Sequence, residues 1–158
     1  GIACGNAIAG QIGTTQQQKI GVFGPVVNQG SRLEGMTRQF GVSICTDENT
    51  AECVRKHLSP QQARVRKLAR VRPKGMDTAI DVYELLPPAG RHSTVSDKQI
   101  RKFEEALALV IDGNWTDAII ALSRLPDEGP KRFLLQHMKS FGNTPPADWS
   151  GVFSLSSK

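Results

Sequence analysis

Two side chains between residues 25 and 38 have the types and the spacing to act on a sugar and a phosphate. Asn28 and Arg32 are four residues apart, so on a helix both project from one face. An arginine guanidinium offers a rigid fork of donors that fits phosphate oxygens, and an asparagine amide both donates and accepts. Such a pair can equally be an ordinary solvent-exposed helix face, and these two residues alone leave both interpretations open.

A second cation, Lys74, ends a basic stretch that contains no acidic residue. The stretch consists of Arg64, Arg66, Lys67, Arg70, Arg72 and Lys74. Phosphate contacts could bind nucleic acid, but no aromatic residues are interleaved, so we expect no nucleic-acid binding. We expect instead a solvated strand face or, at Lys74, an approach to nucleotide phosphates.

The elements that must position these side chains can be predicted from local patterns. Residues 1–24 alternate glycine with apolar residues on either side of a polar stretch at 14–18, which predicts two extended segments joined by a turn. A helix is predicted from Pro25 to about Arg38. Its apolar stripe, roughly opposite Asn28 and Arg32, comprises Val26, Gly30, Leu33 and Thr37.

Further elements follow along the chain. We predict a short strand at Val42–Cys45, then a helix capped by Thr46 or Asp47 and running to about Leu58. Residues 64–74 and 78–86 are two extended runs around Gly75-Met76-Asp77, which predicts a β-hairpin. After a linker at 89–97, the pattern is helical to about Phe141.

Several motifs in the first half of the chain occur in the order found in one enzyme family. They are GIACG at 1–5, AGQIG at 9–13, VNQGSRLE at 27–34 after Gly24, PKG at 73–75 and VYEL at 82–85. This succession closely resembles the C-terminal half of the catalytic domain of class III adenylate/guanylate cyclases. The resemblance implies an α+β fold for residues 1–88, namely the C-terminal half of the ferredoxin-like cyclase sheet.

The resemblance also implies roles for individual residues. Asn28 would orient the ribose, and Arg32 would stabilise the negative charge that develops at the α-phosphate. Lys74 matches the lysine that holds the terminal phosphates, although it could also be one more member of the basic strand. Gly21 stands where the family usually has a polar residue that helps to select the purine, and Pro25 replaces an often acidic or polar residue. The choice between ATP and GTP is therefore not predicted.

Residues 98–158 resemble a tail found on bacterial members of the family. Small residues, a glycine, an aromatic residue and a proline stand at tetratricopeptide-like positions: Ala106, Gly113, Trp115, Ala118, Leu122 and Pro130. The motif PPADWSGV at 145–152 and the final Lys158 complete this resemblance. One helical hairpin cannot bury its own apolar face, so we expect this tail to dock on the cyclase-like half or on a partner subunit.

Composition narrows the class of protein further. The chain has 158 residues, a formal net charge of +5 and 39% hydrophobic residues, which fits a globular protein with no membrane-spanning segment. Its three cysteines lack C-x-x-C spacing, which argues against a zinc site or a disulfide framework and favours a reducing cytoplasm. His57, His92 and His137 stand at unrelated spacings, and we expect no metal site or catalytic histidine among them.

We therefore expect a piece of a longer nucleotidyl cyclase, because the chain starts at Gly1 inside an extended segment. The resemblance implies conversion of ATP or GTP to a 3′,5′-cyclic nucleotide by a homodimer with Mg²⁺ or Mn²⁺. It places the two metal-binding aspartates in the N-terminal half of the family's domain, so the isolated chain should bind no catalytic metal and be inactive. The alternative is a non-catalytic, cyclase-like interaction or regulatory module.

Overall fold

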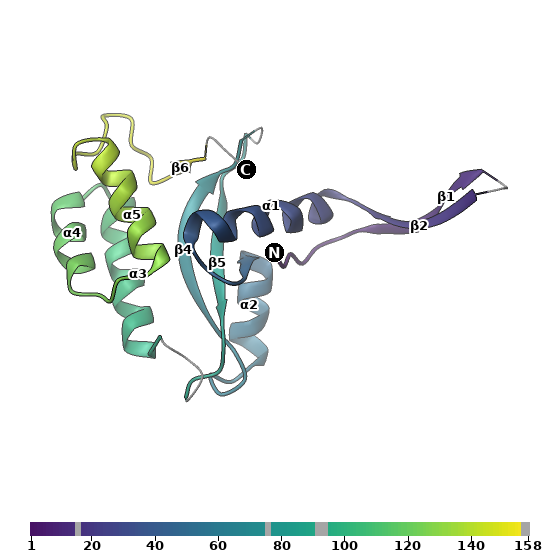
Figure 1. Ribbon diagram of the computed structural model, residues 1–158, viewed down its shortest axis with the longest axis horizontal. Coiled ribbons are helices and arrows are strands. Elements are labelled where there is room, and N and C mark those ends of the chain that lie inside the picture. Colours follow the sequence, from purple (N-terminus) through teal and green to yellow (C-terminus); the bar gives the residue numbers. More distant parts are fainter. Residues whose placement is uncertain (15–16, 75–76, 91–94, 156–158) are drawn as a thin grey trace.

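The computed structural model describes residues 1–14, 17–74, 77–90 and 95–155. In these ranges the chain has a mixed α+β architecture with two sheets and five helices, which confirms the predicted α+β class. Figure 1 shows a long hairpin arm at one end, a central sheet, and a group of three helices at the other end. No helix among the described residues has the length and apolar character needed to cross a membrane.

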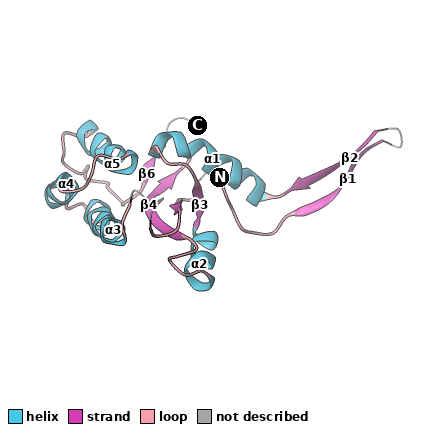
Figure 2. Cartoon of the chain, turned by 60° about the horizontal axis from the view of Figure 1, so that its bottom comes forward, coloured by secondary structure: helices cyan, strands magenta, loops and turns pink. Residues whose placement is uncertain are grey.

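The arm is an antiparallel hairpin of β1 (Ile8–Thr14) and β2 (Gln17–Phe23). It points away from the rest of the chain in both views (Figures 1 and 2), and Gly21 is half-buried whereas the other described residues of β1 and β2 are exposed. The two predicted extended segments are thus confirmed, while residues 15 and 16 of their turn lie outside the described residues. The arm ends at Gly24, whose φ of 146° favours glycine and redirects the chain into the next helix.

Helix α1 (Pro25–Phe40) begins with proline in its first turn, as predicted, and ends at Gly41 with a left-handed φ of 64°. Its buried face consists of Leu33, Met36 and Phe40, and the predicted stripe is therefore correct at Leu33 but continues further. The remaining members of that stripe are half-buried.

The central sheet has the strand order β3-β5-β4-β6. Strand β4 (Arg64–Arg72) pairs antiparallel with β5 (Ile80–Leu86), as predicted, with a bulge between Lys67 and Ala69. Strand β3 (Cys45–Asp47) begins later than predicted, because the Val42 N–H still bonds to the Thr37 carbonyl at the end of α1. Asp47 caps α2 (Glu48–His57), as predicted, by accepting the Thr50 N–H at 2.9 Å.

Three helices follow: α3 (Asp97–Ile111), α4 (Trp115–Ser123) and α5 (Gly129–Ser140). The expected helical segment to about Phe141 is confirmed. The tail is not all-helical, however, because β6 (Phe153–Ser154) pairs in parallel with the end of β4. This strand was not predicted, because two residues are too few to show a strand periodicity.

The tail and the cyclase-like half share one hydrophobic core. It joins Phe40 of α1 and Leu68 of β4 to Phe103, Leu134 and Phe153 of the tail, all of them fully buried. The expected docking of the tail on the cyclase-like half is therefore confirmed. The other face of the sheet is covered by α2, whose Ala51 and Val54 contact Val65 and Tyr83 (Figures 1 and 2).

The basic stretch of β4 is not a solvated strand face, and that expectation is wrong for its first half. Arg66 is only 1% exposed and bridges Glu84 at 2.6 Å and Glu128 of the tail at 2.7 Å. Burial opposes its charge, but the bonds to Glu128 and Glu84 outweigh that effect, so the pKa of Arg66 lies above its usual value. Arg64 is also buried and is paired with Asp97 at 2.8 Å. These two buried arginines therefore link the sheet to the tail through ion pairs.

Candidate functional site

Helix α1 and the segment after β4 bring two of the predicted site residues together. The Arg32 Nη1 donates a hydrogen bond to the Lys74 carbonyl oxygen at 2.8 Å, across 42 residues of sequence. Arg32 is half-buried, whereas Lys74 and its side chain are exposed. A guanidinium has five N–H donors, so this bond fixes the direction of the head group while using only one of them. The bond thus joins the Arg32 side chain to the backbone of a second cationic residue.

Asn28 lies one turn before Arg32 on α1 and is exposed to solvent. Both residues belong to the N-terminal half of the helix, next to the start of the arm (Figure 1). Asn28 and Arg32 thus share the N-terminal half of α1, and Arg32 contacts the backbone of Lys74. The structure gives this placement, and the roles assigned to the three residues remain predictions.

Buried Asp47 holds the N-terminal half of α1 in place. Its Oδ2 accepts the Cys4 N–H at 3.0 Å and the Gln29 side-chain amide at 3.4 Å, while its Oδ1 caps α2. Gln29 follows Asn28 directly, so this carboxylate ties the first residues, α1 and α2 together next to the candidate site. The helix cap could be predicted from the sequence, whereas these two long-range bonds could not.

Gly21 lies in β2, opposite Gly10. A Cβ atom at position 21 would lie 2.7 Å from the ring of Phe23 and 3.2 Å from Ile12 Cδ1. The space for a side chain at this position is therefore taken by the outer edge of the Phe23 ring. A larger residue at position 21 would need that ring to turn away, which an exposed ring at the strand end can do.

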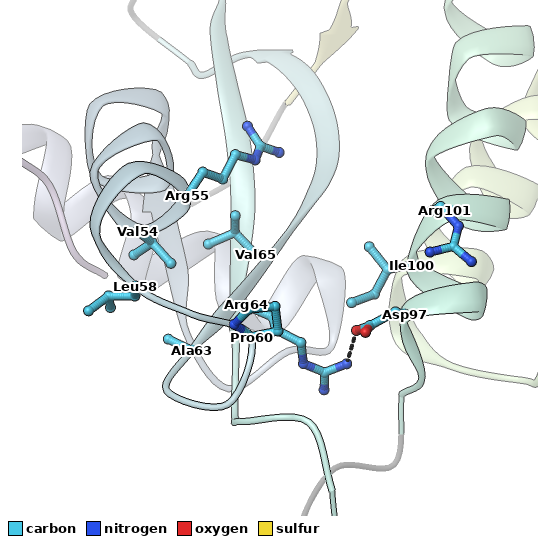
Figure 3. Close-up of a pocket in the computed structure, with 10 residues that line it drawn as sticks. All are labelled: Val54, Arg55, Leu58, Pro60, Ala63, Arg64, Val65, Asp97, Ile100 and Arg101. Carbon is cyan, nitrogen blue, oxygen red and sulfur yellow. Dashed lines mark hydrogen bonds and ion pairs between the residues drawn. The ribbon is translucent and has the colours of Figure 1, made fainter.

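Two cavities lie elsewhere on the sheet. One of about 300 Å³ opens between α2, β4 and α3 (Figure 3), where apolar side chains such as Leu58 and Ile100 adjoin the Arg64–Asp97 ion pair. The other, of about 220 Å³, is polar and is lined by Gln29, Asp47 and Arg70, among others. Neither is lined by Asn28, Arg32 or Lys74.

The acidic and thiol groups do not form a metal centre within the described part of the chain, where no group of three or more His, Cys, Asp or Glu residues could hold an ion. The three cysteines are free. Burial raises the pKa of the Cys45 thiol to about 12, which makes it a poor nucleophile. Trp115 and Trp149 anchor the tail to α3, because both indole N–H groups donate to the Val110 carbonyl near its end.

The comparisons with known proteins found adenylate cyclases that are similar to part of this chain. The chain is 32% identical over 87 residues to Adenylate cyclase 1 of Rhizobium meliloti (strain 1021), and 36% identical over 86 residues to Adenylate cyclase of Anabaena cylindrica. Each match covers 54% of this chain but only 12% and 16% of the two relatives. No protein-family profile matches the chain. About half of the chain is thus related to adenylate cyclases, and it spans a small part of their length.

Proposed function

We propose that this chain is the C-terminal half of a class III nucleotidyl cyclase domain with its helical tail. In this proposal the longer protein converts ATP or GTP to a 3′,5′-cyclic nucleotide and pyrophosphate. The observation that carries it is the hydrogen bond from Arg32 to the Lys74 carbonyl at 2.8 Å, because it joins the two cationic residues of separate motifs at one surface. The similarity to two adenylate cyclases supports the same assignment.

The proposed roles of these residues follow from the charge that develops on the phosphates during the reaction. During cyclisation, negative charge builds up on the α-phosphate and on the leaving pyrophosphate. A fixed guanidinium at Arg32 would stabilise the charge on the α-phosphate, and the exposed Lys74 ammonium would hold the terminal phosphates. Asn28, one turn away, would orient the ribose by donating to and accepting from its hydroxyl groups.

The Mg²⁺ or Mn²⁺ implied by the resemblance would neutralise phosphate charge when bound. In this proposal its carboxylate ligands are the two aspartates that the resemblance places in the N-terminal half of the family's domain. We therefore assign no catalytic step to the metal here. The isolated chain is expected to form no cyclic nucleotide.

The test compares two arginines of α1 in the longer protein that carries this chain. Arg32→Ala should lower kcat by about 10²- to 10³-fold with a smaller change in KM, because the lost interaction is made mainly in the transition state. Arg38→Ala is the matched control, since Arg38 lies on the same helix in an exposed i,i+4 pair with Glu34. Its rate should stay within about twofold of the parent. Equal rates for Arg32→Ala and the parent would exclude Arg32 from the site.

The second candidate is a cyclase-like interaction or regulatory module without catalysis. It is favoured by one observation: at Gly21 the place of a purine-selecting side chain is filled by Phe23. It predicts that the longer protein forms no cyclic nucleotide, and a turnover assay with ATP and GTP distinguishes the two candidates. Conversion of either nucleotide, slowed by Lys74→Ala, would exclude it.

We also propose that the longer protein is a homodimer, as the resemblance implies, and the exposed arm supports this proposal. Ile8 and Ile20 are 75% and 81% exposed. Apolar side chains at such exposure in a projecting hairpin suit burial against a second subunit.

A further inference from the structure

We propose that strand β6 of the tail is a positioning strand for the candidate site: its pairing with the end of β4 fixes the backbone that presents Lys74 to Arg32. This inference rests on the proposed function for its catalytic consequence. Its structural part can be tested separately.

The end of β4 depends on β6. Pairing with β5 runs from Arg64 to Val71 and stops there, whereas pairing with β6 covers Val71 and Arg72. The Leu155 N–H then donates to the Arg72 carbonyl at 3.0 Å. Arg72 lies two residues before Lys74, whose carbonyl accepts the Arg32 bond. The last residue of β4 is therefore held by the tail strand and not by its hairpin partner.

The strand β6 is itself held firmly by the tail. Phe153 is fully buried, with its ring centroid 4.6 Å from that of His137 and 5.3 Å from that of Trp149. The indole N–H of Trp149 donates to the carbonyls of Val110 and Ile111 at the end of α3. The two-residue strand β6 is thus anchored to the helices of the tail.

The same group of helices also holds the other partner of the site. The ring of Phe40, the last residue of α1, lies 4.5 Å from that of Phe133 in α5. Next to it Gly129 packs so closely that a Cβ there would lie 2.2 Å from the Phe40 carbonyl oxygen. The tail therefore fixes both α1, which carries Arg32, and the strand end that leads to Lys74.

The consequence is a specific role for one backbone N–H group. Without the Leu155 bond, residues 72–74 gain freedom, and Arg32 loses the fixed carbonyl that directs its guanidinium. A misdirected cation can still attract a nucleotide but stabilises the transition state less well. The loss should therefore appear in kcat more than in KM.

The test uses Leu155→Pro, which removes the N–H, and Leu155→Ala, which keeps it, both in the longer protein that carries this chain. We expect Leu155→Pro to lower kcat about tenfold, with KM within about twofold, and to speed backbone hydrogen exchange in residues 70–74. Leu155→Ala should leave kcat within about twofold and the exchange of residues 70–74 close to that of the parent. If Leu155→Pro does not fold, Phe153→Leu, which loosens the anchor of β6 but stays apolar, takes its place with the same readouts.

The outcomes separate this inference from the proposed function. Unchanged exchange in residues 70–74 of folded Leu155→Pro overturns the inference, whatever the activity. Faster exchange with an unchanged kcat also overturns it if Arg32→Ala does lower kcat. If Arg32→Ala leaves kcat unchanged, the proposed function fails instead, and the exchange result alone decides whether β6 fixes the end of β4.

Discussion

The two antiparallel hairpins of this chain have similar pairing but opposite environments. In β1–β2 nearly every residue is exposed, whereas β4–β5 is covered by α2 on one face and by α1 and the tail on the other. An isolated two-stranded hairpin is marginally stable in water, so the arm gains little from its own side chains. The comparison shows that here strand pairing and burial are separate properties: the alternation of residues predicts the first, and the neighbouring layers determine the second.

The largest expected effect contrasts a buried and an exposed apolar residue. Phe153→Ala should lower the free energy of unfolding by about 3–5 kcal/mol, because it leaves a cavity in the shared core. Ile20→Ala in the arm should change it by less than about 0.5 kcal/mol. Urea unfolding followed by tryptophan fluorescence measures both. Similar losses for the two variants would mean that the arm is part of the cooperative core.

A second pair of variants tests how far the burial of β4 depends on the tail. Glu128→Ala removes one partner of buried Arg66 and should cost about 1–3 kcal/mol of unfolding free energy. Asp127→Ala is the control, since its ion pair with Arg132 is exposed and should contribute about 0–0.5 kcal/mol. Equal stability of both variants would show that Glu84 alone satisfies Arg66.

The arm gives the third prediction. Ile8→Ser combined with Ile20→Ser should leave the unfolding free energy of the chain nearly unchanged, because both side chains are exposed. In the longer protein the same change should raise the dimer dissociation constant at least about tenfold, which corresponds to about 1.4 kcal/mol. Sedimentation velocity over a concentration series measures this constant. An unaltered constant would place the dimer contact elsewhere.

The smallest effect concerns pH. Burial lowers the pKa of His137 below its usual value, so the unfolded chain binds a proton more readily than the folded one. The free energy of unfolding should therefore fall as the pH is lowered from about 7.5 to 5.5, through the ordinary histidine range. His137→Phe should weaken this dependence, whereas His57→Gln, at an exposed helix end, should retain it. A profile that is the same in all three proteins would contradict the assignment to His137.

Local signals explain why much of the fold could be predicted from the sequence. Gly24, Pro25 and Gly41 set the limits of α1, and Asp47 caps α2, because these residues act on their own backbone neighbourhood. Long-range partners could not be predicted in the same way. The bond from Arg32 to Lys74 and the bridge from Arg66 to Glu128 join residues 42 and 62 positions apart, and no local pattern encodes such distances.

The candidate site shows the same division. The motifs predicted the residue types and the helix that carries Asn28 and Arg32, whereas the contact between α1 and the end of β4 came only from the tertiary structure. The basic stretch illustrates the limit most clearly. Arg66 and Arg70 both belong to this stretch, but Arg66 is buried and Arg70 is exposed. The bulge between Lys67 and Ala69 separates the two residues, and Arg66 is paired with Glu128 of the tail.

The parallel pairing of β6 with β4 also sets an order of events during synthesis of the chain. Val71 can pair with Phe153 only after Phe153, 82 residues later in the chain, has been synthesised. At translation speeds of about 5–20 residues per second, this delay is roughly 4–16 s. During that interval Leu68 and Arg66 lack the tail that covers them in the finished protein, so the nascent sheet exposes an apolar face to the cell. This face stays uncovered until the tail has been synthesised and has packed against the sheet.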